Sequence, residues 1–152
     1  IEYVLLPNAQ QKALADFLTE EGVDLIIGGH PHVIQPMEMR WSKAHNKKVF
    51  LIYSLGNLIS NMTTKDTRGG ALAKVKLVRD ENGNPVVDSA SYRLVFTLQP
   101  GGGSKNFRLI PVEDDKSGSL KSNWNVFVNN AEKIFNKHNI DVPRDTTPIR
   151  SK

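Results

Sequence analysis

The sequence predicts an α/β protein in which a βαβ unit is followed by β-hairpins and a C-terminal helix. Three observations favour this fold class: a strand–helix–strand pattern over residues 1–27, alternating polarity between residues 71 and 98, and apolar side chains at helical spacing in residues 123–138. The 152 residues are about the size of one domain, and a hydrophobic fraction of 39% is adequate for one core. This order of elements would make better sense as the second half of an α/β sandwich whose first half precedes Ile1.

The first 27 residues predict the βαβ unit. Ile1–Leu6 is typical of the end of a strand, and Pro7 suits a first helical turn because its missing N–H would be unpaired there anyway. Residues 8–21 carry apolar side chains at helical spacing, and Gly22 then favours the left-handed conformation that ends a helix. Val23–Ile27 is a short apolar run, typical of a strand that is buried on both faces.

Five more strands are predicted after this unit. Residues 37–41 and 49–53 predict short strands on either side of a polar turn. Residues 71–79 and 86–98 alternate apolar and polar side chains, and the Asn82-Gly83 pair between them is a strong hairpin signal. Residues 106–112 predict one further short strand, also by sequence pattern.

The residues after this strand predict a change of organisation. The stretch at 112–122 is polar and acidic, as linkers are, and residues 123–138 form an amphipathic helix whose apolar face we expect to pack on the domain. We therefore divide the chain into a domain at residues 1–113, a linker and helix at 114–140, and a disordered tail at 141–152.

Composition excludes several kinds of function. The chain has no cysteine, so disulfides, thiolate metal sites and cysteine nucleophiles are absent, and any metal site must use nitrogen and oxygen ligands. No run of about 18 apolar residues predicts a membrane-spanning helix. The net charge is +4, but the lysines are scattered and lack interleaved aromatic residues, so we expect no nucleic acid as a partner.

The segment GGHPHV, at residues 28–33, holds the side chains best suited to chemistry. It follows an apolar strand, and open α/β sheets bind ligands beyond the carboxyl ends of their strands. Its glycines allow close approach of the backbone to a ligand, and Pro31 favours an extended His30. An extended segment would place the imidazoles of His30 and His32 on one side, with Cα atoms roughly 6.5–7 Å apart. Both could then bind one metal, or one each of a metal pair; the alternative is two ordinary turn residues.

A second apolar strand, residues 50–53, runs into the polar turn Ser54-Leu55-Gly56-Asn57. If this strand is adjacent in the sheet, Ser54 and Asn57 reach the same edge as the histidines. Asn57 could then hydrogen-bond a ligand oxygen, whereas its alternative role is to cap the turn.

Residues 1–40 followed by VFLIYSLGNLIS resemble the bacterial capsule-synthesis protein family, which is CapA-like and also called the poly-γ-glutamate biosynthesis family. The pattern covers roughly the first half of the chain, and its specific elements are G-H-P-H-V, the following Q-P-x-E and S-L-G-N. The resemblance implies a calcineurin-like metallophosphoesterase fold, a four-layered α/β sandwich with a two-metal centre at the strand ends. This chain would be its C-terminal part.

The resemblance makes His30 and His32 metal ligands, because they match the G-H-x-H element of the metallophosphoesterases. With Asn57, which would help to place the substrate, they form the expected catalytic group. Further residues expected around the substrate or the ligands are Glu38, Ser54 and Gly29. Glu38 would orient a ligand or touch the metal shell, and its alternative is a surface strand residue.

Other family ligands would precede Ile1. Glu2 and Tyr3 match the residues that follow a His-Trp-Gly element in the family, and that element is absent from this chain. The resemblance implies a divalent metal, Mn, Fe or Zn, with two ions in the full-length protein and an incomplete site here. We therefore expect that the chain as given is not a competent enzyme.

Three functions follow as hypotheses. The full-length protein could be a two-metal-dependent hydrolase of a phosphoester or related bond, or a non-catalytic assembly or export factor that binds an anionic polymer such as poly-γ-glutamate. In the third, the histidines are ordinary turn residues of a non-catalytic fragment. The resemblance implies an extracytoplasmic place in the cell envelope, periplasmic or membrane-anchored. Expected partners are an anionic polymer or phosphoester substrate, the upstream half of the same protein, and a second copy through an exposed sheet edge.

Overall fold

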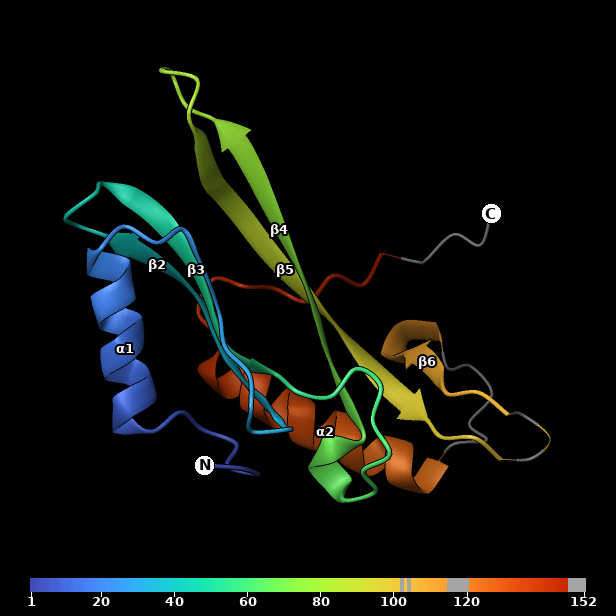
Figure 1. Cartoon of the computed structure of the whole chain (residues 1–152). Helices are drawn as coiled ribbons and strands as arrows, with labels where there is room; N and C mark the ends of the chain where they lie inside the picture. The colour runs from blue at the N-terminus through green and yellow to red at the C-terminus, as the bar shows by residue number, and fades with distance from the viewer. Residues whose placement is uncertain (102, 104, 115–120, 148–152) are drawn as a thin grey trace.

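The structure of the chain is a computed structural model that describes residues 1–101, 103, 105–114 and 121–147. Two α-helices and two three-stranded sheets make up its regular elements, so the α/β class is confirmed (Figure 1). In chain order the elements are α1 (Ala9–Glu20), β1 (Leu25–Ile27), β2 (Ile34–Ser42), β3 (Lys47–Leu55), η1 (Lys65–Thr67), β4 (Gly69–Arg79), β5 (Pro85–Leu98), β6 (Arg108–Pro111), η2 (Val112–Asp114) and α2 (Lys121–His138).

The first sheet has the order β1-β3-β2. Strand β1 runs parallel to β3, and β2 runs antiparallel to β3, as expected for two strands joined by a short polar turn. Helix α1 lies along this sheet (Figure 1). It begins at Asn8, whose side chain and that of Gln11 form a reciprocal capping box. Pro7 therefore lies before the cap rather than in the first helical turn.

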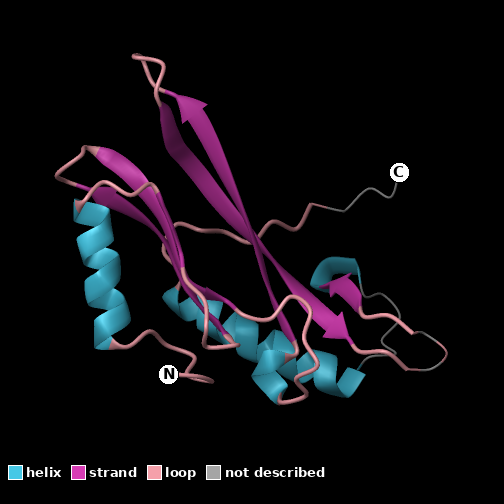
Figure 2. Ribbon diagram, viewed as in Figure 1, coloured by secondary structure: helices cyan, strands magenta, loops and turns pink. Residues whose placement is uncertain are grey.

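The second sheet has the order β4-β5-β6 and is antiparallel throughout. The predicted hairpin between β4 and β5 is confirmed, and Gly83 adopts the positive φ of 83° that a tight turn needs. Its tip extends well beyond the rest of the molecule (Figures 1 and 2).

The main core lies between the two sheets and α2. Alternate side chains of β2, β3 and β5 meet the apolar face of α2, which confirms the prediction that this helix packs on the domain. The largest side chains buried there are Phe50, Phe96, Phe127, Phe135, Ile34, Met37, Ile52 and Leu94. A smaller cluster of Ala15, Leu51 and Tyr53 seats α1 on the opposite face of the first sheet.

Two predictions about the N-terminal region are wrong. Residues 1–7 form loop rather than a strand (Figure 2), because they lack a ladder of backbone hydrogen bonds to a neighbouring strand: the backbone–backbone bond described for them is from Tyr3 N to Pro31 O. The first strand of the predicted βαβ unit is therefore missing. Strand β1 is also not buried on both faces: Leu25 is 38% and Ile27 62% exposed, because β1 is the edge strand of its sheet.

The predicted tail begins with a packed segment. Val142 is buried, and the backbone of Ile140 exchanges hydrogen bonds with Met37 and Met39 of β2. Three residues later Pro143 O accepts from Tyr92 N of β5, and Asp145 N donates to Tyr92 O. The prediction of disorder is therefore wrong for residues 141–147; the rest of that tail, like residues 115–120 of the predicted linker, lies outside the described residues.

Candidate functional site

The GGHPHV segment forms the turn between β1 and β2. Its start is fixed by packing: Gly28 N donates to Ile52 O at 2.7 Å, and a Cβ on Gly28 would lie 2.2 Å from Tyr53 O. Gly28 thus allows the chain to pass closely over β3. A Cβ on Gly29 would meet nothing within 4 Å, so the backbone at Gly29 is open on that side.

The backbone of this turn is strained. His30 has a φ of 92° and His32 a φ of 61°, and Tyr3, which hydrogen-bonds the turn, has a φ of 63°. The predicted extended conformation of His30 is therefore wrong, because a following proline disfavours the helical region without excluding a positive φ. Such a conformation costs on the order of 1–3 kcal/mol per residue and concentrates at functional sites. Three of the five non-glycine residues with positive φ in the described chain lie in this one cluster.

The rings of His30 and His32 lie near one another, although the backbone between them is not extended. Their ring centroids are 6.4 Å apart with planes tilted by 45°. Asn57 reaches the same place, because parallel β1 and β3 end at one edge of the sheet and Asn57 follows β3 by two residues. Its Oδ1 lies 3.1 Å from His32 Nδ1.

Asn57 itself is held from its other end. Its Nδ2 donates to Thr67 O at 3.0 Å and lies 3.3 Å from Met62 Sδ, and its backbone N donates to Gly69 O at 3.1 Å. The side chain is buried, and both ends of its amide have protein partners. These contacts account for a supporting role of Asn57 toward His32.

Two residues of the N-terminal segment complete the cluster. Glu2 Oε1 lies 3.7 Å from His32 Nε2, and the Tyr3 ring stacks on the His32 ring with centroids 6.1 Å apart. Desolvation, and then the nearby Glu2 carboxylate, raise the pKa of Tyr3. Sequence reasoning had only placed Glu2 and Tyr3 in a family pattern. Their contact with His32 needs the fold, because it depends on the hydrogen bond from Tyr3 N to Pro31 O.

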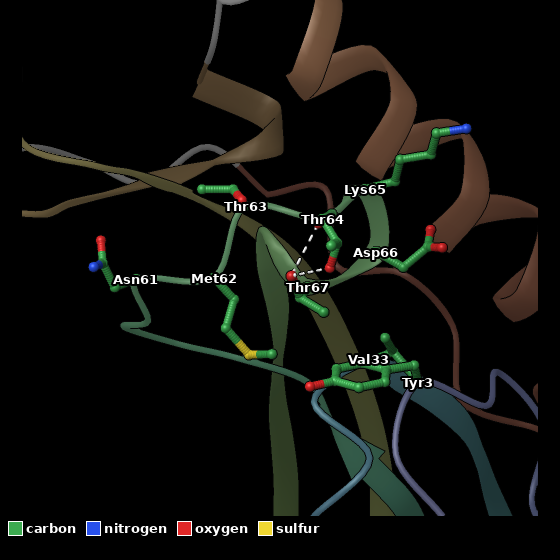
Figure 3. A pocket seen from close by; sticks show the side chains of 9 residues that line it. All are labelled: Tyr3, Val33, Asn61, Met62, Thr63, Thr64, Lys65, Asp66 and Thr67. Atoms are coloured by element: carbon green, nitrogen blue, oxygen red, sulfur yellow. Dashed lines mark hydrogen bonds between the residues drawn. The ribbon is translucent and has the colours of Figure 1, made fainter.

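A hollow of about 750 Å³ opens on the far side of Tyr3. Figure 3 shows Tyr3 and Met62 facing each other across it, while the ends of Lys65 and Asp66 extend away from them. Thr64 and Thr67 are joined through their hydroxyls at 2.9 Å, which holds the wall formed by η1. The hollow therefore adjoins the histidine cluster through the Tyr3 ring and offers mostly uncharged groups.

The other expected site residues lie elsewhere. Ser54 is buried and accepts a hydrogen bond from Gly56 N at 3.2 Å, so it shapes the turn. Glu38 pairs with Arg40, with Nη2 2.6 Å from Oε1, and accepts from the Tyr53 hydroxyl at 3.2 Å. The described contacts of Glu38 are with this ion-pair cluster between α1 and β2, which the sequence did not predict, and not with the histidines.

The donors present suit part of a metal site. Imidazole nitrogen and carboxylate oxygen bind zinc, manganese and iron, and Nε2 of His32 faces the Glu2 carboxylate at 3.7 Å. Among the residues that the structure describes, no group of three or more His, Asp or Glu side chains is placed to hold an ion together. The donor types present thus suit a cation, but a full set of ligands needs groups other than those described.

Sequence comparison finds a family that resembles the N-terminal part of this chain. Residues 1–62, which include α1, the GGHPHV turn, the first sheet and Asn57, match the family described as bacterial capsule synthesis protein PGA_cap. The matched segment is 62 of the 152 residues, and it is similar to that family.

Two curated relatives carry the comparison further. The chain is 37% identical over 82 residues to the PGA biosynthesis protein CapA of Bacillus subtilis (strain 168), covering 54% of this chain and 20% of that protein. It is 36% identical over 87 residues to the capsule biosynthesis protein CapA of Bacillus anthracis, covering 57% of this chain and 19% of that protein. The chain thus spans about a fifth of the length of these relatives. No solved structure gives a significant match.

Proposed function

We propose that the full-length protein takes part in the synthesis of capsule polymer, poly-γ-glutamate or a related anionic chain, as a two-metal-dependent hydrolase with a metallophosphoesterase-like fold. His30 and His32 would hold metal, with Mn, Fe or Zn as candidates. A bound divalent metal would lower the pKa of a water molecule and so supply a nucleophile. The observation that carries the proposal is the oriented His32 imidazole, with Asn57 on Nδ1 and a carboxylate beside Nε2.

The residues of this chain support such a site in three ways. The strained turn holds two imidazoles within one small region, and Gly28 fixes the start of that turn against β3. Glu2 places negative charge where a cation would be attracted. The hollow beside Tyr3 offers room for a substrate group next to the histidines.

The remaining ligands would come from the rest of the full-length protein. The exposed side chains of β1 and of α1, among them Ile27, Leu14 and Phe17, support a packed neighbour at this edge, since parallel strands are normally covered on both faces. We propose that the upstream part of the same protein packs there. Light scattering on the 152-residue chain checks the competing occupant: a concentration-dependent dimer would point to a second copy instead.

A location in the cell envelope, periplasmic or membrane-anchored, is part of the proposal. It is supported by the relatives' names, which refer to capsule biosynthesis. Within the described part of the chain, neither helix has the length and apolar character needed to cross a membrane.

Metal content of the purified full-length protein tests the proposal. We expect close to two equivalents of Mn, Fe or Zn by mass spectrometry, lost in the His30→Ala/His32→Ala double variant. His138→Ala, which removes a histidine at the end of α2, is the matched control and should keep its metal. A full-length protein that stays metal-free after reconstitution would contradict the hydrolase proposal.

The second candidate function is binding of an anionic polymer without catalysis. It is favoured by the net charge of +4 and by Lys74 and Lys76 on the exposed side of β4. A salt-dependent affinity for poly-γ-glutamate that falls in Lys74→Glu and is unchanged in His30→Ala would support it.

A further inference from the structure

We propose that Asn57 is a positioning residue that holds neutral His32 in the tautomer with its hydrogen on Nδ1, so that Nε2 keeps a free lone pair beside Glu2. The tautomer itself is independent of the proposed function; only the use of that lone pair for a metal rests on it. This role is additional to the sequence-based expectation that Asn57 places substrate.

The orientation of the Asn57 amide is the first step. Its Nδ2 donates to the carbonyl oxygen of Thr67 at 3.0 Å. If the amide were flipped, its oxygen would face that carbonyl, two acceptors would meet in a buried place, and a hydrogen bond would be lost. The Met62 sulfur, 3.3 Å from Nδ2, is likewise a weak acceptor and favours the same orientation. Oδ1 therefore faces His32.

The tautomer follows from this orientation. An amide oxygen only accepts hydrogen bonds, so the His32 nitrogen 3.1 Å away must be the donor. Which nitrogen of a neutral imidazole carries the hydrogen is set by such a contact. A free histidine side chain favours hydrogen on Nε2, so the protein selects the less favoured form.

The selected tautomer has a consequence at the other nitrogen. Nε2 becomes an acceptor, and the nearest charged group is the Glu2 carboxylate at 3.7 Å. Two electron-rich atoms then face each other, and a cation is the species that both would attract. Metal-bound histidines commonly show this arrangement, with the second nitrogen donating to a protein oxygen.

Nitrogen NMR of the imidazole rings tests the tautomer on the 152-residue chain without metal. Spectra are recorded at about pH 9, where histidine is neutral, and the His32 signals are assigned by their loss in His32→Gln. We expect Nδ1 to carry the hydrogen in the wild type. Asn57→Ala should shift the population to hydrogen on Nε2, whereas Asn57→Asp, which keeps an acceptor oxygen, should retain it on Nδ1. Asn61→Ala, in the wall of the hollow, is the control and should leave the His32 signals unchanged.

Each outcome of these measurements either supports or contradicts the assigned tautomer of His32. Hydrogen on Nε2 in the wild type, or on Nδ1 in a folded Asn57→Ala, overturns the proposal. If Asn57→Ala does not fold, the wild type together with Asn57→Asp decides it, because loss of the Nδ1 hydrogen in either would contradict the assignment. In the full-length protein, Asn57→Ala should weaken metal binding about 10–100-fold, as loss of such supporting contacts does. If His32 carries its hydrogen on Nδ1 but the full-length protein binds no metal, the proposed function is contradicted and the positioning role of Asn57 is still supported.

Discussion

The guanidinium of Arg40 and the carboxylate of Glu38, two positions apart on β2, form an ion pair with Nη2 2.6 Å from Oε1. Alternate residues of a strand share a face, so both side chains point toward α1, where Asp16 lies 2.7 Å from Arg40 Nη1. Arg40 also donates to the Tyr53 hydroxyl at 2.9 Å, which donates in turn to Glu38. This cluster joins α1, β2 and β3 and is separate from the histidine cluster.

Tyr53 should ionise far above the ordinary tyrosine range. Burial, and then the Glu38 carboxylate, raise its pKa to about 12 from 10.0. Because the folded pKa lies above the unfolded value, the associated stability is fully present below about pH 10 and is lost as the pH rises toward 12. Ultraviolet absorbance titration should show a phenol near pH 12 that disappears in Tyr53→Phe. A wild type in which every tyrosine ionises near pH 10 would contradict the cluster.

Removing the two carboxylates of this cluster should have unequal effects. The Glu38 side chain is only 16% exposed, and Glu38→Ala leaves a mostly buried guanidinium with fewer acceptors, which should lower the free energy of unfolding by about 1–3 kcal/mol. Asp16 is 67% exposed, so Asp16→Ala should cost about 0–1 kcal/mol. Urea unfolding measures both variants. Equal losses would show that burial does not govern this pair.

Replacing each of the two glycines of the turn by alanine should also have unequal effects on stability. A Cβ at Gly28 would lie 2.2 Å from Tyr53 O, a backbone atom that cannot move aside, so Gly28→Ala should destabilise the fold by about 1–3 kcal/mol or more. At Gly29 a Cβ meets nothing within 4 Å, and Gly29→Ala should change stability by less than about 0.5 kcal/mol. Thermal unfolding of the matched pair checks this. A tolerated Gly28→Ala would mean that the chain passes β3 less closely.

Asp145 should contribute to acid stability. Hydrogen bonds from Thr147, and then Arg93, lower its pKa to about 2 from 3.8. Because the folded pKa lies below the unfolded value, this contribution is present above about pH 4 and is lost as the pH falls toward 2. The stability of Asp145→Asn should therefore fall less steeply than that of the wild type across this range.

A nearby exposed carboxylate gives the control for this comparison. Asp141 lies in the same segment with a φ of 53°, a conformation that asparagine tolerates well, so Asp141→Asn controls for the removal of one carboxylate from this segment. If Asp145→Asn and the wild type lose stability in parallel, the Thr147 contacts do not act on Asp145 as described.

Regular patterns made much of the fold predictable. Alternation in β5 and the helical spacing in α2 each place one apolar face, and each of these faces packs in the main core. On β4 the same pattern holds only in part, because Ala73 and Val75 pack against the core while Leu77 is 51% exposed. The strand predicted from the apolar N-terminal residues does not form, because a strand also needs a hydrogen-bonding neighbour and hydrophobicity alone does not supply one. The predicted burial of Leu25 and Ile27 was wrong for a related reason, since their strand lies at the edge of its sheet and no neighbour covers these side chains.

The proximity of three candidate site residues was predictable from the sequence, but their hydrogen-bond partners were not. His30, His32 and Asn57 follow strands whose ends meet, so their proximity could be inferred from strand order. The hydrogen bond from Asn57 to Thr67 O could not be inferred, because every residue has a backbone carbonyl and the residue type does not indicate which one is used. The contacts of Glu38 were not predictable either. Glu38 lies on the face of β2 that packs toward α1, and which residues occupy that face depends on the register of the strand.

The segment around Ile140 and Pro143 has a consequence for how quickly the chain folds. Its backbone joins β2 to β5, and Asn139 Oδ1 accepts from Met37 N across 102 residues of sequence (Figure 1). Closing so long a loop carries a large entropic cost before any contact compensates for it. A topology of this kind slows folding, because it raises the mean sequence separation between contacting residues. The first sheet and the β4–β5 hairpin should therefore form early, and the two sheets should become locked together only in the last step.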